Sequence, residues 1–275
     1  FADVTLIRPE AQATWRPALS KQRWDAADAE FAKAKPGKPG QWKFRRALPA
    51  RWEMQRNALR FWVQPAPSGH VGIFPDQACH WDWLAEQTRH SAGPAKVLSL
   101  FGHTGLATLA ATAAGQEVTH VDASRKAVAL ARENQELSGL ADRPVRWVVE
   151  DALTFVQREA RRGNRYHGLI LDPPRFGRGP TGEIWKLKDS LPELLAACKA
   201  VLSPKPLFVL LNLYVTVVTR DRAKQKTESL QKSLQKMLHN SPLEITSGEL
   251  AVLDGAARRI SASVFARAQR RPANS

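Results

Sequence analysis

The chain has 275 residues, of which 43% are hydrophobic and 24% are charged, proportions typical of a soluble globular protein with one large domain and a small appendage. No apolar run approaches the roughly 20 residues that a membrane-spanning helix needs, and the first residues lack the pattern of a secretory signal. Two cysteines are too few for a disulfide framework or a zinc cluster. These features predict a cytoplasmic protein that does not insert into membranes.

The net charge of the chain is strongly positive. Lysine and arginine total 41 against 26 aspartate and glutamate, a formal net charge of +15. This balance favours a polyanionic partner, with nucleic acid first and an anionic membrane surface second. A basic surface that serves only solubility stays open as an alternative, because net charge identifies no ligand.

Residues 1–68 differ in pattern from the rest, because short apolar segments there are separated by proline, glycine and charge. They predict a small β-rich subdomain with a helical insertion over residues 25–35. Trp15, Trp24 and Trp42 are interspersed with basic residues. They could stack on the bases of single-stranded nucleic acid, or they could form the core of the subdomain.

Residues 69–275 predict alternating strands and helices after a first helix over residues 74–91. The expected strands span residues 97–101, 117–121, 145–149, 168–171, 207–213, 243–253 and 260–265. The expected helices span residues 104–114, 125–137, 152–162, 191–202 and 220–238. The fold class is therefore α/β: a doubly wound, mostly parallel seven-stranded sheet whose last strand is antiparallel, because a short Asp254-Gly255 turn joins the final pair.

The first four predicted strands each end in a residue type that suits ligand binding. The first ends in a turn with Gly102 and Gly105, and Asp122 follows 20 residues after Gly102, where an acid that binds ribose hydroxyls is expected. The third strand ends at Asp151 and the fourth at Asp172. Because ligands of doubly wound sheets lie at the carboxyl ends of the strands, these groups are expected to line one site.

Each of these acids also has a structural interpretation. Asp122 and Asp151 could be helix N-caps, and Ser124 could cap its helix equally well. The Asp172-Pro173-Pro174 run is more specific. Two prolines directly after a strand stiffen the backbone and would hold the Asp172 carboxylate in place, as an active site requires.

Four motifs in this order resemble the class I S-adenosylmethionine-dependent methyltransferases: residues 97–105, His120-Val-Asp-Ala-Ser124, Asp151-Ala152 and Leu171-Asp-Pro-Pro-Arg-Phe176. More narrowly, they are similar to the ribosomal RNA large-subunit methyltransferase group, whose members carry Asp-Pro-Pro-Lys-Phe or a similar run. Phe74-Pro-Asp-Gln77 is also similar to that group's segment before the catalytic core. The resemblance covers roughly residues 70–270 and implies a Rossmann-like methyltransferase sheet.

The resemblance implies a role for each motif residue. S-adenosylmethionine would contact Gln77, Phe101, Gly102, His103, Thr104, Gly105, Asp122, Ala123, Ser124, Asp151, Ala152 and Asp172, with Asp122 on the ribose and Asp151 and Ala152 at the adenine. The turn with Asp172, Pro173, Pro174 and Phe176 would face the methyl group and the target base. Methyl transfer from a sulfonium is an in-line displacement, so positioning supplies most of the catalysis and no metal is needed.

One departure from the family concerns the target atom. Relatives that methylate carbon 5 of cytosine use a cysteine near the fourth or fifth strand, whereas Cys79 and Cys198 lie on predicted helices. Without that thiolate, covalent catalysis is in doubt and a nitrogen target is favoured. Asp172 or a backbone carbonyl would then accept a hydrogen bond from the attacking amino group.

Three basic or aromatic residues are candidate substrate contacts. Arg175 follows the proline turn, Arg178 lies in a glycine-rich segment over residues 177–182 that predicts a flexible loop, and Tyr214 follows the fifth strand. Arg178 could clamp a phosphate or lie on a solvated loop, and Tyr214 could stack on a flipped base or pack in the core. The basic helix over residues 220–236 is interpreted as a solvated face.

The sequence thus predicts an S-adenosylmethionine-dependent methyltransferase that acts on RNA, ribosomal RNA first. Three other hypotheses stay open. They are a methyltransferase acting on a protein or small molecule, an RNA-binding protein with a vestigial cofactor fold, and a nicotinamide-dependent oxidoreductase on a similar sheet.

Overall fold

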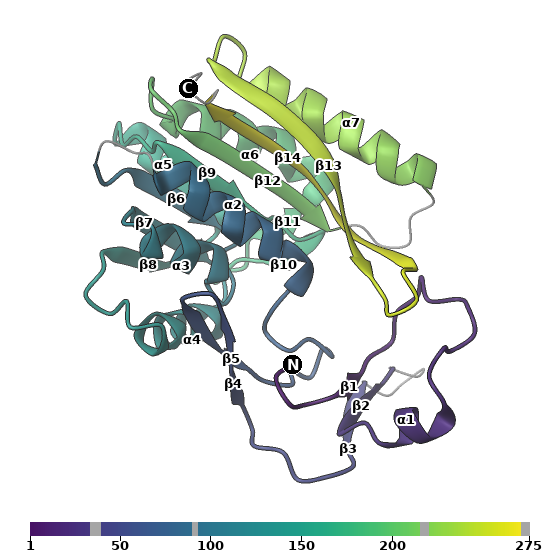
Figure 1. The fold of residues 1–275 in the computed structure, drawn as a ribbon. Coiled ribbons are helices and arrows are strands. Elements are labelled where there is room, and N and C mark those ends of the chain that lie inside the picture. The colour runs from purple at the N-terminus through teal and green to yellow at the C-terminus, as the bar shows by residue number, and fades with distance from the viewer. Residues whose placement is uncertain (34–39, 90–92, 215–219, 271–275) are drawn as a thin grey trace.

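The computed structural model describes residues 1–33, 40–89, 93–214 and 220–270, and its centre is a seven-stranded sheet of order β13-β14-β12-β9-β6-β7-β8 (Figure 1). The parallel strands are β6 (Lys96–Leu100), β7 (Glu117–Asp122), β8 (Val145–Val149), β9 (Gly168–Leu171) and β12 (Phe208–Tyr214). β14 (Arg259–Arg270) pairs antiparallel with β12 and with the edge strand β13 (Leu243–Leu253). This sheet confirms the predicted fold class.

Helices cover both faces of the sheet, as parallel strands require. α2 (Ala78–Arg89), α3 (Leu106–Ala113) and α4 (Arg125–Leu137) lie on one face, and α5 (Ala152–Arg161), α6 (Leu187–Val201) and α7 (Arg220–Met237) on the other. Side chains of Ser124 and Asp151 cap α4 and α5 at their first turns. Across the described ranges, no helix combines the length and apolarity that crossing a bilayer requires.

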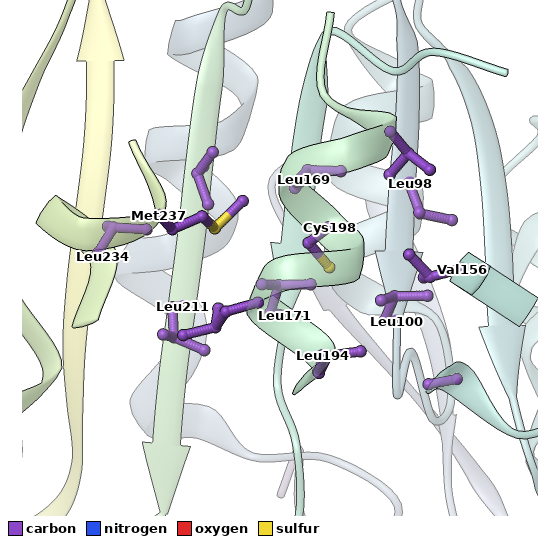
Figure 2. Packing of buried hydrophobic residues seen from close by; sticks show 14 of the residues in the cluster. Leu98, Leu100, Val156, Leu169, Leu171, Leu194, Cys198, Leu211, Leu234 and Met237 are labelled. Carbon is purple, nitrogen blue, oxygen red and sulfur yellow. The ribbon is translucent and has the colours of Figure 1, made fainter. Parts of the chain in front are cut away.

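The main core lies between the sheet and α5, α6 and α7. Figure 2 shows leucines of neighbouring strands, such as Leu98 and Leu169, directed toward the helix that carries Leu194 and Cys198. Cys198 is fully buried, and this burial raises the pKa of its thiol to about 12, so it acts as a small apolar side chain. Alternate strand residues, including Val97 and Ile170, face the other way and pack against α2 and α3.

The N-terminal part is β-rich, as predicted, but its helix is misplaced. β1 (Leu6–Ile7), β2 (Ala29–Ala32) and β3 (Gln41–Phe44) form a three-stranded sheet, and α1 (Lys21–Asp25) lies between β1 and β2 in the sequence. The predicted helix over residues 25–35 is therefore wrong in its described part. Ala29–Ala32 gains strand partners on both sides, which outweighs the helix propensity of alanine. The division at residue 68 stays a prediction.

A β-hairpin, β4 (Trp52–Arg56) and β5 (Leu59–Val63), connects the N-terminal part to the helices. Trp52, Phe61 and Val63 share a core with Trp81 of α2 and with α3.

The three tryptophans considered for base stacking have different surroundings. Trp42 packs in the N-terminal sheet against Phe31, and its indole N–H donates to Ala66 O at 2.8 Å. Trp24 is 40% exposed, and the Arg258 guanidinium covers the ring of Trp15.

The segment after the proline turn is more ordered than predicted. β10 (Phe176–Arg178) and β11 (Ile184–Lys186) form a hairpin, so the flexible loop expected over residues 177–182 is wrong at its start. α6 begins four residues before its predicted start. The prediction placed Pro192 in the first turn of the helix, whereas the structure has Pro192 farther inside it. A single 3₁₀ turn, η1 (Pro75–Gln77), precedes α2.

The contact between β9 and β12 predicts the effect of Gly168→Ala. A Cβ at Gly168 would lie 2.5 Å from the ring of Phe208, which is fully buried and cannot retreat. We expect a loss of about 1–3 kcal/mol in the free energy of unfolding from this overpacking, measured by urea denaturation. The control Gly255→Ala meets no atom within 4 Å and should change stability by less than about 0.5 kcal/mol. Equal stability of the two variants would contradict the described packing.

Candidate active site

The predicted ligand-binding residues meet at one edge of the sheet because three parallel strands end together. Leu100 pairs with Val121 on one side and with Leu171 on the other. The residues that follow these strands are therefore neighbours. Gly102 N donates to Val121 O at 3.2 Å, and Asp172 N donates to Leu100 O at 3.4 Å. The glycine turn, Asp122 and Asp172 thus lie side by side.

A cavity of about 610 Å³ opens at this edge. The predicted residues that line it are Gln77, Phe101, His103, Asp122, Ala123, Ser124, Asp151, Ala152, Asp172, Pro173, Pro174, Arg175, Phe176, Arg178 and Tyr214. Gly102, Thr104 and Gly105 instead line a smaller cavity of about 40 Å³ that shares Phe101, His103 and Asp172 with the larger one.

Several cavity residues were missed by the sequence analysis. They are His70, Phe74, Asp76, Trp185, Asn212 and Ser263. Asn212 was detectable in principle, since it is a polar residue near the end of an otherwise apolar predicted strand. Ser263 carried no signal, because its place beside the site depends on the antiparallel pairing of β14 with β12.

The glycine turn between β6 and α3 has a tightly fixed backbone. Phe101, His103 and Gly105 have φ values of 57°, 47° and 89°, in the left-handed region. A Cβ at Gly102 would lie 2.4 Å from the ring of the buried His120, so only glycine fits there. Thr104 Oγ1 donates to Gly72 O at 2.6 Å, which ties the turn to the preceding segment.

Asp122 organises the turn and keeps capacity for a ligand. Its Oδ2 accepts from His103 N at 2.9 Å and its Oδ1 from Ser124 N at 2.8 Å. Ser124 Oγ accepts from Ala127 N at 3.2 Å, so Ser124 caps α4 and Asp122 does not. Each carboxylate oxygen has a second lone pair, so Asp122 can still accept hydrogen bonds from two adjacent hydroxyls.

Asp151 caps α5. Its Oδ1 accepts from both the backbone N and the Oγ1 of Thr154, each at 2.9 Å. The N-cap interpretation of this residue is therefore correct. The residue is only 8% exposed, yet it lines the cavity beside Ala152. The small, apolar side chain of Ala152 therefore lines the cavity next to the Asp151 carboxylate.

Asp172 is held by two side-chain amides. Gln77 Nε2 donates to its Oδ2 at 2.8 Å, and Asn212 Nδ2 donates to its Oδ1 at 2.8 Å. Burial raises the pKa of Asp172, while the hydrogen bonds from Asn212 and Gln77 and the nearby His103 act in the opposite direction. The two amides fix the carboxylate in one plane at the cavity wall.

The proline turn behind Asp172 is also fixed. Trp185 of β11 donates its indole N–H to Pro174 O at 2.7 Å, and its ring packs on Phe101 with centroids 4.9 Å apart. In contrast, the outer wall of the cavity is open. Phe176 is 55% exposed and Tyr214 is 50% exposed. The cavity therefore joins a rigid inner wall to an accessible aromatic rim.

A doubly wound sheet with a glycine turn and an acid at the ends of its first two strands defines an α/β enzyme that binds a nucleoside-containing cofactor. A family model described as S-adenosylmethionine-dependent methyltransferase matches residues 9–206. The crystal structure of a SAM-dependent methyltransferase from Agrobacterium tumefaciens is 42% identical and superposes with a TM-score of 0.89, covering 98% of this chain and 85% of that chain. A methyltransferase complexed with SAH shares the fold at 20% identity and a TM-score of 0.69, covering 90% of this chain and 63% of that one.

Curated relatives include the ribosomal RNA large subunit methyltransferase I of Aeromonas hydrophila, 29% identical over 134 residues, or 48% of this chain and 30% of that protein. The same-named protein of Klebsiella pneumoniae is 32% identical over 90 residues, or 32% of this chain and 22% of that protein. The chain thus spans less than a third of the length of these two relatives.

The chain belongs to the S-adenosylmethionine-dependent methyltransferase family, and S-adenosylmethionine is its cofactor. The donor set of the cavity fits this molecule, since Asp122 can accept from a ribose diol and Phe101, Ala123 and Ala152 offer an apolar wall. Family membership decides against the nicotinamide-dependent oxidoreductase.

The close approach of Gly102 to His120 predicts a loss of cofactor binding in Gly102→Ala. The added Cβ has to displace either the turn or the buried ring, which moves the residues beside the cavity. We expect the affinity for S-adenosylhomocysteine, measured by calorimetry, to fall at least about tenfold. Gly177→Ala is the matched control on the opposite wall, because its Cβ would lie 3.6 Å from Pro174 Cγ, an ordinary contact. Unchanged binding in Gly102→Ala would refute the role of the turn.

Burial of His120 predicts a specific loss of stability in acid. Desolvation, with a smaller contribution from His103, lowers the pKa of His120 to about 3, while Thr108 Oγ1 lies 2.9 Å from its Nδ1. Below the ordinary histidine pKa of about 6.5, only the unfolded state takes up the proton, so this residue costs about 1.4 kcal/mol of stability for each pH unit down to the folded value.

We therefore expect the stability lost between pH 7.5 and pH 5 to be smaller in His120→Gln than in the wild type, by about 2 kcal/mol. Urea denaturation at the two pH values measures the difference. The same substitution at the exposed His239 is the control and should leave the acid-induced loss unchanged. A loss in His120→Gln as large as in the wild type would show that His120 is already charged in the folded protein.

Proposed function

We propose that this chain transfers a methyl group from S-adenosylmethionine to a base nitrogen of RNA, with large-subunit ribosomal RNA as the substrate to test first. The observation that carries the proposal is the position of Asp172. Its carboxylate is fixed by two amides between the glycine turn on one side and the exposed Phe176 and Tyr214 on the other.

The inner half of the cavity would hold the cofactor. Asp122 would accept from the ribose hydroxyls, with Ala123 and Ser124 flanking the adenosine, and Asp151 and Ala152 would lie at the adenine. The turn over residues 101–105 and Gln77 would face the methionine part. S-adenosylmethionine supplies an electrophilic methyl group on a positively charged sulfur, so the protein has to supply position and a proton acceptor.

The outer half of the cavity would hold the target base. Asp172, or the carbonyl of Pro173, would accept a hydrogen bond from the attacking amino group. As the nitrogen–methyl bond forms and the carbon–sulfur bond breaks, the Asp172 carboxylate would take the proton that the nitrogen loses. Pro173 and Pro174 keep these acceptors in place. Phe176 and Tyr214 would stack on the base, and Arg175 and Arg178 would contact backbone phosphates.

Two observations support RNA as the substrate, and a third supports a base nitrogen as the target. The formal net charge of +15 suits a polyanion, and the curated relatives carry the name ribosomal RNA large subunit methyltransferase. Within the described ranges, the residues that line the cavity include neither cysteine, since Cys198 is in the core and Cys79 is exposed on α2. This lining supports a route that uses no cysteine nucleophile.

The test uses labelled S-adenosylmethionine and unmodified large-subunit ribosomal RNA. We expect the wild type to label one base on nitrogen and Asp172→Asn to lower the rate at least about 100-fold, because the variant loses its proton acceptor. Its affinity for S-adenosylhomocysteine should change by less than about threefold. Asp142→Asn, at an exposed carboxylate, is the matched control.

Other outcomes identify the alternatives. Labelling of a protein or small molecule but of no RNA would overturn the RNA substrate. RNA binding without methylation by the cofactor-loaded wild type would show a vestigial cofactor fold.

A further inference from the structure

A relay of hydrogen-bonded side chains leads from Arg267 through His80 and Asn212 to Asp172. Arg267 Nε of β14 donates to His80 Nδ1 at 3.1 Å. His80 Nε2 of α2 lies 3.4 Å from Asn212 Oδ1, and Asn212 Nδ2 donates to Asp172 Oδ1 at 2.8 Å. The relay joins one helix, two strands and the residue that follows β9, all distant from one another in the sequence.

The buried side chains of this relay have little freedom to move. His80 is fully buried and Asn212 is 3% exposed. The His80 ring packs edge-on against Phe265, with centroids 5.1 Å apart. The Arg267 guanidinium lies 4.7 Å from the Phe265 ring and also donates to Cys79 O at 3.1 Å. Packing therefore holds His80 and Arg267, which form the end of the relay farthest from Asp172.

The direction of each hydrogen bond follows from the chemistry of the groups. Arginine has donors and no acceptor, so Nδ1 of His80 must accept and the ring proton must be on Nε2. Nε2–H can only donate, which turns the oxygen of the Asn212 amide toward His80 and its NH₂ group toward Asp172. A flipped amide would place its oxygen against the carboxylate, which is repulsive.

We propose that His80 is a positioning residue for methyl transfer: through Asn212, it sets the orientation and the proton affinity of the Asp172 carboxylate. The 3.4 Å link between His80 and Asn212 is the longest in the chain, and it is the one that the tests below address. The proposal rests on the proposed role of Asp172 as the proton acceptor.

The charged surroundings of the relay are compatible with this role. Burial and the charge of Arg267 lower the pKa of His80 to about 3, so the ring is neutral near pH 7 and keeps a single tautomer. Asp172 itself faces His103 from the glycine turn and Asp76 from η1. The variants below leave both of these groups in place, so a change in the titration of Asp172 reports on the relay.

The first test compares two amides at position 80. In His80→Asn the side-chain amide replaces Nδ1, facing Arg267, but does not reach Asn212, whereas the longer side chain of His80→Gln can place an NH₂ group near the Nε2 position. With the labelled RNA as substrate, we expect the acid limb of kcat in His80→Asn to move up by about one pH unit and kcat to fall roughly tenfold at pH 7. KM for S-adenosylmethionine should stay within about twofold.

His80→Gln should restore most of the rate and the wild-type pH profile. A merely structural role would lower the rate of both variants without moving the acid limb. Equal pH profiles in the wild type and in a folded His80→Asn protein would therefore overturn the proposal.

The second test is made on the wild type and needs no RNA substrate; a variant serves only to assign the signal. The imidazole ¹⁵N shifts of the wild type, labelled at its seven histidines, report the tautomer of His80 directly. We expect a neutral ring with the proton on Nε2 from pH 8 to pH 5, assigned by the signal that disappears in His80→Gln. An Nδ1–H tautomer or a charged ring at pH 6 would overturn the relay even where RNA is methylated. Absence of RNA methylation together with the Nε2–H tautomer would count against the proposed substrate and in favour of the relay.

Discussion

The carboxylate of Asp172 accepts one hydrogen bond on each oxygen, from amides of two elements that the chain order keeps far from it. Gln77 precedes the first strand of the sheet and Asn212 lies on its fifth parallel strand. They reach the same residue because β9 is inserted between β6 and β12. In a partly desolvated position, two oriented donors keep a carboxylate available as an acceptor without immobilising it by an ion pair. The remainder of the site is arranged around this fixed group.

The two walls of the cavity differ in rigidity, and this difference matches the two ligands that a methyltransferase has to bring together. Asp122 and the left-handed backbone of the glycine turn form an inner wall that is fixed by hydrogen bonds within the protein itself. Phe176 and Tyr214 form an outer wall that is half exposed. A small cofactor gains from a preformed site, whereas a large substrate needs an accessible surface.

Much of the fold follows from the sequence, because hydrophobic period and helix stop signals are local. β8, β9 and α4 have the predicted bounds, and the acids after β7, β8 and β9 meet because parallel strands end at one edge. The prediction of a helix over residues 25–35 was wrong because strand pairing outweighs the helix propensity of alanine. The start of α6 was predicted too late because proline is common in the first turn of a helix, whereas Pro192 lies farther inside α6. His80 was missed for another reason: its role depends on packing across the sheet, which no local pattern encodes. Asn212 carried a local signal as a polar residue near a strand end, but its pairing with Asp172 depends on the strand order.

The buried amide of Asn134 on α4 has a consequence for how the chain can be divided. Its Oδ1 accepts from Trp62 N of β5 at 2.9 Å, and its Nδ2 donates to Thr104 O in the glycine turn at 2.9 Å. One side chain thus connects an N-terminal hairpin to the cofactor wall, and the hairpin also fills the space over α3. A fragment that begins after β5 would leave this amide oxygen buried without its partner and would open the surface of α3 to water. The hairpin therefore supports the glycine turn through α4, and we expect a fragment that begins after β5 to be less stable than the full chain.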